Sequence, residues 1–152
     1  MPLLIAVLAA AAPLFALGTE RWGGLNPCLL CLWQRWPYWV AAGFALLSLA
    51  LPRRWMLRLS AAALLFGAAV AVVHVGVESA WWPSPLPGCA APGAGQARTV
   101  EQMLAEMQAR PAKPCDEATF LIPGIPVSMA AMNLIYALGL AGLALGAARR
   151  RG

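Results

Sequence analysis

The fold is decided by one uncharged stretch, residues 59–77, with the sequence LSAAALLFGAAVAVVHVGV. At about 1.5 Å of rise per residue, a helix of about 20 residues crosses the roughly 30 Å hydrocarbon core of a bilayer. Lipid offers no hydrogen-bond partner to backbone groups, so a stretch this apolar crosses a membrane as a helix. A strand of a transmembrane barrel would alternate polar and apolar residues, which this stretch does not do.

Three further stretches have the same character, at residues 2–18, 33–51 and 127–148. The 152-residue chain is 61% hydrophobic and 11% charged, whereas soluble domains are about 45–50% apolar and about 25% charged. This composition excludes an ordinary soluble globule, collagen and a coiled coil. We predict a single all-α integral membrane domain over residues 1–152, built as a four-transmembrane-helix bundle. The alternative for residues 2–18 is a cleaved signal peptide ending at the small residues 16–18, although a basic n-region is missing.

The arginines predict how the bundle lies in the membrane. Residues 52–58, PRRWMLR, and the tail Arg149–Arg151 are strongly basic and flank apolar stretches, so both are expected in the cytoplasm together with the two termini. Residues 19–27 and 78–126 have no such basic excess and are predicted to form the two external loops. The net charge of +5 is therefore explained by membrane orientation, and we predict lipid contact and no nucleic-acid partner.

All four cysteines, Cys28, Cys31, Cys89 and Cys115, fall in or beside the two external loops. Disulfides persist outside the bacterial inner membrane, and four cysteines allow three pairings. Sequence separation favours Cys28 with Cys31 and Cys89 with Cys115. A Cys-x-x-Cys bridge closes too small a loop to stabilise a fold, so reactivity explains it better. Inert structural bridges are the alternative, and because zinc would need a second closely spaced pair, we predict no metal.

The residues around the first pair indicate an activated thiol. Asn26 suits a helix N-cap and Pro27 the first helical position, which makes Cys28 the second residue of a helix. The free N–H groups and the helix dipole would then stabilise a thiolate. Cys28, Cys31 and Arg35 follow at i, i+3 and i+7, on one helical face. Arg35 can lower a thiolate pKa and donate hydrogen bonds to a carbonyl on an electron acceptor; the alternative is that it reaches the lipid headgroups.

The second external loop contains a helical pattern. Thr99 and Gln102 form a capping box. Apolar residues recur after it at i, i+3, i+4 and i+7, namely Val100, Met103, Leu104 and Met107. We predict an amphipathic helix on the membrane surface, with packing against other loop residues as the alternative.

The motif at residues 26–37, NPCLLCLWQRWP, closely resembles the start of the second transmembrane helix in the DsbB family of bacterial disulfide-forming membrane proteins. The resemblance covers nearly the whole chain and includes the order of four spans with two external cysteine pairs. Further matches are WPSP at residues 82–85 ahead of Cys89, and PCDE at residues 114–117 followed by Gly124 and Asn133.

The resemblance implies a disulfide:quinone oxidoreductase of the bacterial inner membrane, with its cysteines facing the periplasm. Such a protein reoxidises a DsbA-like thioredoxin-fold thiol oxidase and reduces ubiquinone or menaquinone. By position, Cys89 forms the mixed disulfide with the partner and Cys115 resolves it. The electrons then reach Cys28–Cys31 through a transient Cys115–Cys28 bridge. Cys31 lies against the quinone in this family, and Arg35 helps to bind it.

His74 and Glu78 lie one helical turn apart near the outer end of the third span. Some DsbB relatives carry a similar His-x-Gly-x-Glu stretch, which makes His74 a candidate for quinone binding or protonation. The alternative is a solvated helix end. Nearby, Trp81 and Trp82 are predicted to lie in the interfacial aromatic belt, and in the second span Pro37 is predicted to kink the helix.

Two other functions stay open. One is a structural or assembly membrane protein with two inert external disulfides. The other is an enzyme similar to vitamin K epoxide reductase, which also has a four-helix bundle and two cysteine pairs. In that family the motif cysteines usually end a late helix, whereas here they begin the second one.

Overall fold

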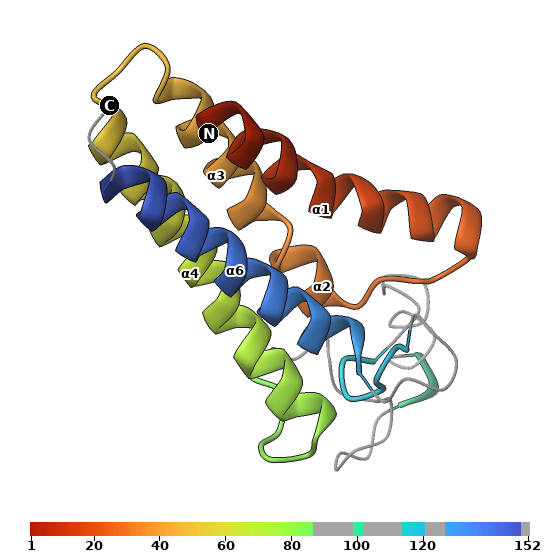
Figure 1. Cartoon of the computed structure of the whole chain (residues 1–152). Coiled ribbons are helices and arrows are strands. Elements are labelled where there is room, and N and C mark those ends of the chain that lie inside the picture. The colour runs from red at the N-terminus through yellow and green to blue at the C-terminus, as the bar shows by residue number, and fades with distance from the viewer. Residues whose placement is uncertain (87–98, 102–113, 121–126, 150–152) are drawn as a thin grey trace.

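The computed structural model describes residues 1–86, 99–101, 114–120 and 127–149. The helices in these ranges are α1 (Pro2–Gly23), α2 (Leu29–Trp33), α3 (Trp36–Leu47), α4 (Arg53–Glu78) and α6 (Met129–Arg149), as Figure 1 shows. Extended pairing within the same ranges is limited to one antiparallel bridge between Phe120 and Ser128. The prediction of an all-α chain is therefore confirmed.

Three of these helices, α1, α4 and α6, are long and apolar enough to cross a membrane. They overlap the spans predicted at residues 2–18, 59–77 and 127–148. The predicted span at residues 33–51 contains α3, whose 12 residues extend only about 18 Å at 1.5 Å per residue. The structure thus confirms three membrane-capable helices, and the fourth span stays a prediction.

Helix α1 is longer than its predicted span. It continues through Gly23 and ends at Gly24, which adopts φ 64° and donates its backbone N–H to the carbonyl of Thr19. Glycine enters this left-handed region without the steric cost that other residues pay. The prediction that the first external loop begins at Thr19 is therefore wrong by one helical turn, and this turn holds Glu20.

The second span is interrupted as Pro37 predicts. Helix α2 ends at Trp33, and α3 begins at Trp36 with Pro37 in its first turn. Proline has no amide hydrogen to continue the helical ladder. Gly67 of α4 faces this proline, since a Cβ atom placed at Gly67 would lie 3.1 Å from Pro37 Cβ. The break thus coincides with a close approach of α3 and α4.

Small residues form the contacts between the helices. Helices α4 and α6 lie side by side, α3 packs against α4, and α1 packs against α3 (Figure 1). Small side chains let helices approach closely, which is the main source of helix association in lipid. The fully buried alanines of this core include Ala9, Ala41, Ala45, Ala61, Ala137 and Ala144.

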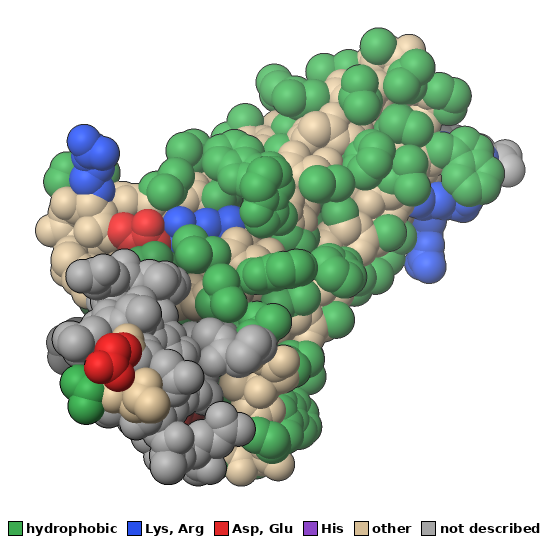
Figure 2. All heavy atoms as spheres, turned by 180° about the vertical axis from the view of Figure 1, so that it is seen from behind, with side chains coloured by type: hydrophobic (Ala, Val, Ile, Leu, Met, Phe, Trp, Pro, Cys, Tyr) green, Lys and Arg blue, Asp and Glu red, His purple; other side chains and the backbone are tan. Residues whose placement is uncertain are grey.

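The outer surface of the helices is apolar as well. Figure 2 shows hydrophobic side chains over much of the helical part of the molecule. Exposed examples include Leu3, Val7, Phe15, Leu46, Phe66 and Ile135. Contiguous apolar surface on this scale indicates contact with lipid.

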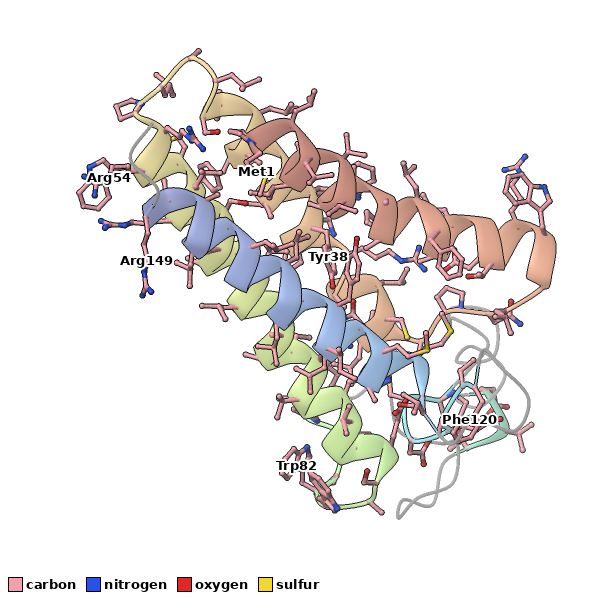
Figure 3. The ribbon with its side chains drawn as sticks, in the orientation of Figure 1. Met1, Tyr38, Arg54, Trp82, Phe120 and Arg149 are labelled. Carbon is pink, nitrogen blue, oxygen red and sulfur yellow. The ribbon has the colours of Figure 1, made fainter. Side chains whose placement is uncertain are left out.

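Basic residues of the connector and of the tail, as far as the structure describes them, lie at one end of the molecule. Met1, Arg54 and Arg149 are at this end, and Trp82 and Phe120 are at the opposite one (Figure 3). The predicted topology requires the basic connector and the basic tail on the same side of the membrane. The arrangement of the helices meets this requirement.

Trp82 folds back onto α4. Ala80 adopts φ 55°, the chain turns, and the Trp82 indole N–H donates to the carbonyl of Val73 at 3.2 Å. The ring lies so close to Gly76 that a Cβ atom there would overlap it. Trp82 therefore covers the end of α4, while Trp81 is 68% exposed, as a residue of an interfacial belt would be.

Of the predicted surface helix, the structure describes Thr99, Val100 and Glu101. Val100 and Glu101 are helical and exposed. The remaining residues of the capping box and of the apolar stripe lie outside the described ranges, so the surface helix stays a prediction.

Candidate functional site

Cys28 is the N-cap of α2. Its backbone is extended, with φ −83° and ψ 168°, and its Sγ accepts a hydrogen bond from the backbone N–H of Cys31. The prediction that Asn26 caps the helix and that Pro27 is its first residue is therefore wrong, because the helix begins at Leu29. An N-cap acceptor satisfies an amide that has no partner within the helix. In this protein a sulfur does so.

Cys28 and Cys31 are free thiols, and their sulfur atoms lie 2.8 Å apart in a hydrogen bond. The hydrogen bond between the two thiols is the main cause that lowers the pKa of Cys28 to about 4, with a further contribution from His74 and against the effect of burial. The same bond, together with burial, raises the pKa of Cys31. The pair thus carries one negative charge, on Cys28.

His74 from α4 lies against this pair. Its Nε2 is 3.5 Å from Cys28 Sγ and 3.6 Å from Glu78 Oε1. His74 is only 3% exposed, so the alternative of a solvated helix end is excluded. The geometry places His74 beside the sulfur of Cys28, and its part in quinone binding stays a prediction.

A chain of polar side chains continues behind His74. Nδ1 of His74 is 2.8 Å from the amide nitrogen of Gln34, and the Gln34 carbonyl oxygen accepts from the amide of Asn133 at 2.5 Å. The hydroxyl of Tyr38 donates to the Asn133 side chain at 2.6 Å. Gln34 had no predicted role, although a glutamine between a cysteine motif and an arginine in an apolar stretch was a usable indication.

Arg35 lies in the turn between α2 and α3, so it does not share one continuous helix with Cys28 and Cys31. Its guanidinium is paired with the carboxylate of Glu20 from α1. The Nε atom of Arg35 is buried and has no hydrogen-bond partner among the described residues. Glu20 was missed in the sequence because its turn was assigned to a loop, and an acidic residue on a membrane helix is the indication that would have found it.

One cavity of about 110 Å³ brings these groups together. It lies among α1, α2, α3, α4 and α6 and is lined by Cys28, Cys31, Arg35 and His74. An apolar groove of about 360 Å³ between α1 and α6 shares four of its lining residues: Ala12, Ala16, Met129 and Asn133. The predicted site residues of α2, of the turn after it and of α4 thus meet at one cavity. This cavity adjoins the apolar groove between α1 and α6.

Cys115 is also brought to this region. It is 1% exposed and packs in one apolar cluster with Cys28, Leu30 and Val77. Cys115 is disulfide-bonded, and since Cys28 and Cys31 are free, neither is its partner. Cys89 lies outside the described residues, so its pairing with Cys115 stays a prediction.

The cluster also has the spacing of a metal site. Ligand atoms of Cys28, Cys31 and His74 lie within 4.8 Å of one another. In this structure, however, the two thiols are hydrogen-bonded to each other, and His74 Nδ1 faces the amide nitrogen of Gln34. This leaves the proton of a neutral ring on Nε2, the atom nearest the sulfur, where a metal would need a lone pair. We therefore interpret the cluster as a thiol site.

One comparison with known proteins identifies a family. A family model described as "Disulfide bond formation protein DsbB" matches residues 1–147. No curated protein and no solved structure matches the chain.

Proposed function

The chain belongs to the DsbB family of multi-pass membrane proteins of disulfide bond formation, and from this premise we propose that it is a disulfide:quinone oxidoreductase that reoxidises a periplasmic DsbA-like thiol oxidase. In this proposal both termini and both basic clusters are cytoplasmic, and the four cysteines face the periplasm. The observation that carries it is a free thiol pair, Cys28 and Cys31, in one cavity with Arg35, whose side chain is 15% exposed.

The cavity fits the head group of a quinone. Arg35 offers a buried Nε–H without a partner, and a ring carbonyl is an acceptor of the right kind. Cys31 lines the same cavity, and the adjoining apolar groove between α1 and α6 suits an isoprenoid tail. A bound quinone supplies the terminal two-electron oxidation, in which it takes up two electrons and two protons and leaves as a quinol.

The disulfide exchange that precedes this step uses the four cysteines in order. The partner's thiols reduce the Cys89–Cys115 bridge and become a disulfide. The Cys115 thiolate then attacks Cys28 of the Cys28–Cys31 bridge and releases Cys31. Cys89 next attacks Cys115, which restores the Cys89–Cys115 bridge and releases Cys28. The described structure corresponds to the end of this sequence, with Cys28 and Cys31 reduced and Cys115 bridged.

The surroundings of Cys28 favour the last exchange. A thiol of low pKa is the better leaving group in thiol–disulfide exchange, and the pKa of Cys28 is lowered to about 4. Burial of Cys28 and Cys115 in one apolar cluster supports the attack of one on the other. The alternative of two inert bridges requires a permanent Cys28–Cys31 disulfide, whereas these residues are free thiols.

The test is quinone reduction by the purified full-length chain in detergent or lipid, with a reduced DsbA-type donor and either ubiquinone or menaquinone. Turnover with one quinol formed for each donor disulfide supports the proposal. If the donor is oxidised without quinol formation, or if neither changes, the proposed activity is wrong. The same assay with a vitamin K epoxide substrate distinguishes the third alternative.

A further inference from the structure

The hydrogen bonds behind Cys28 have a direction. The hydroxyl of Tyr38 donates to Oδ1 of Asn133, whose amide nitrogen donates to Oε1 of Gln34. This leaves the amide nitrogen of Gln34 facing Nδ1 of His74 at 2.8 Å, with Nε2 of His74 3.5 Å from Cys28 Sγ. Each side-chain amide thus uses its oxygen on one side and its nitrogen on the other.

This direction determines the protonation state of the histidine. The amide nitrogen of Gln34 is only a donor, so Nδ1 of His74 must present its lone pair. The single proton of a neutral imidazole is then on Nε2. A doubly protonated ring would set two donors, the Nδ1–H and the Gln34 amide, against each other at 2.8 Å.

We propose that Gln34 and Asn133 are positioning residues for the first cysteine pair: they hold His74 in the neutral tautomer whose Nε2–H points at the Cys28 sulfur. This inference deepens the proposed function, on which it rests. Neither residue needs to touch the electron acceptor for this role. Asn133 lies on α6 and Gln34 in the turn between α2 and α3, and both act on Cys28 through the ring of His74.

The position of the ring proton explains which sulfur of the pair carries the charge. Cys28 Sγ accepts from the backbone N–H of Cys31, and in this tautomer it also accepts from His74 Nε2 at 3.5 Å. Two donors around one sulfur favour its thiolate form. With a lone pair on Nε2 instead, His74 would accept a hydrogen bond from the Cys28 thiol, which favours the protonated sulfur, and the charge of the pair would no longer be fixed on Cys28.

The charged and titratable groups around Cys28 come from several elements. Cys31 of α2 and His74 of α4 contact its sulfur, and the Glu78 carboxylate lies 3.6 Å from the same Nε2. Glu78 is therefore a second acceptor for the Nε2–H and reinforces the same tautomer. The wider cavity adds Glu20, Arg35 and Glu117.

The histidine tautomer can be measured directly because the chain contains one histidine. The full-length protein is labelled with ¹⁵N-histidine, reduced at Cys28 and Cys31, and studied in detergent micelles at neutral pH. Two-bond ¹H–¹⁵N correlations distinguish a protonated ring nitrogen from one with a lone pair. We expect Nε2 protonated and Nδ1 unprotonated; a proton on Nδ1, alone or together with one on Nε2, overturns the proposal.

Two substitutions test the two positioning residues separately. Asn133→Asp removes the amide donor, so the Gln34 side chain is expected to turn over and present its oxygen to His74, which moves the ring proton to Nδ1. Gln34→Leu removes the partner of Nδ1 and is expected to give a mixture of tautomers. An unchanged tautomer in both variants contradicts the proposal, because a purely structural role would leave the ring proton on Nε2.

The second measurement is the pH dependence of alkylation at Cys28, located by mass spectrometry. Gln34→Leu is expected to raise the pKa of Cys28 by about one unit, as expected when a hydrogen bond to a charged group is weakened. Ser60→Ala is the matched control, since it removes another buried bond between helices, from Ser60 Oγ to the Ala41 carbonyl at 2.9 Å. An equal shift in both variants would assign the effect to general loosening of the bundle and overturn the proposal.

Both measurements are independent of quinone and of the thiol oxidase. Absence of quinone reduction in the wild type would contradict the proposed function but leave the tautomer result standing. The wrong tautomer in an active wild type would contradict only the positioning role of Gln34 and Asn133.

Discussion

Arg35 and Glu20 form an ion pair between α1 and the turn that joins α2 to α3, and both side chains are largely withdrawn from solvent. The cation predicted to bind a quinone thus already has an anionic partner. The Nε–H of Arg35 is a donor that has no hydrogen-bond partner among the described residues. A carbonyl in the cavity therefore either uses this atom or competes with Glu20.

Arg35→Ala is expected to weaken quinone use. A hydrogen bond from a charged donor contributes about 1.5–3 kcal/mol, so the apparent KM for quinone should rise roughly ten- to a hundredfold. The measurement is the quinone dependence of turnover with a fixed concentration of reduced donor. Arg21→Ala is the control, because Arg21 lies in the last turn of α1 and is exposed. An unchanged KM in Arg35→Ala would show that this side chain does not bind the quinone and that its contact is the ion pair with Glu20.

Glu20→Gln is expected to destabilise the bundle through its effect on Arg35. Removing one partner of a buried ion pair leaves an uncompensated charge, and for this partly solvated pair we expect a loss of about 1–3 kcal/mol. Unfolding is followed for Glu20→Gln, Arg35→Ala and the double variant. A double variant as unstable as the sum of the two single variants would show that the two side chains do not interact.

Cys31→Ser is expected to abolish quinone reduction and to preserve the mixed disulfide between Cys89 and the thiol oxidase. Cys31 lines the cavity with Arg35, whereas attack by the partner's thiolate needs only the Cys89–Cys115 bridge. Quinol formation and gel-shift trapping of the partner measure the two steps. Cys89→Ser is the matched control and should lose the trapped complex. Quinone reduction at the wild-type rate in Cys31→Ser would refute the proposed electron route.

Alkylation of Cys28 is expected to continue well below neutral pH. Its pKa is lowered from an ordinary value of 9.0 to about 4, so the thiolate, and with it reactivity, should be lost only as the pH falls through about 4. The linked contribution to stability has the same sign: it is complete above the unfolded-state pKa and disappears as the pH falls through the folded-state pKa. Rapid alkylation over a pH series checks this, and a midpoint near that of a free thiol would contradict the assignment of the charge to Cys28.

Gly76→Ala is expected to destabilise the C-terminal end of α4. The added methyl group would overlap the Trp82 ring, and overpacking costs typically about 1–3 kcal/mol. Gly139→Ala is the control, since nothing lies within 4 Å of a Cβ atom at that position of α6. Thermal unfolding compares the two variants, and tryptophan fluorescence should change only in Gly76→Ala, where the surroundings of Trp82 change. Equal stability of both would show that the Trp82 ring moves aside freely.

The parts of the fold that depend on local chemistry were predictable from the sequence. Apolar length identified α1, α4 and α6, and Pro37 identified the break between α2 and α3. The start of α2 was predicted wrongly because Asn26 is the better N-cap by residue type, whereas the cap in the structure is the sulfur of Cys28. The N-cap preferences of the residue types do not include a cysteine whose sulfur becomes an acceptor by losing its proton.

The contacts of the candidate site were less predictable because they join distant parts of the chain. The bond between Asn133 and Gln34 and the pair of Arg35 with Glu20 depend on how four helical segments pack. Sequence patterns give the face of a helix but not the neighbour that it meets. Among the contacts of the site, the sequence predicted only the local ones, between Cys28 and Cys31 and between His74 and Glu78 one helical turn apart.

Because Cys28 Sγ is the N-cap of α2, the stability of this helix depends on the oxidation state of Cys28. When Cys28 enters a disulfide its sulfur becomes neutral and a weak acceptor, and loss of an N-cap costs a helix about 1 kcal/mol. A helix of five residues has few other bonds with which to resist fraying. Electron transfer thus changes the local folding free energy of α2. In the proposed exchange the oxidised pair therefore has the weaker helix cap, and it is in this form that the Cys115 thiolate attacks the sulfur of Cys28.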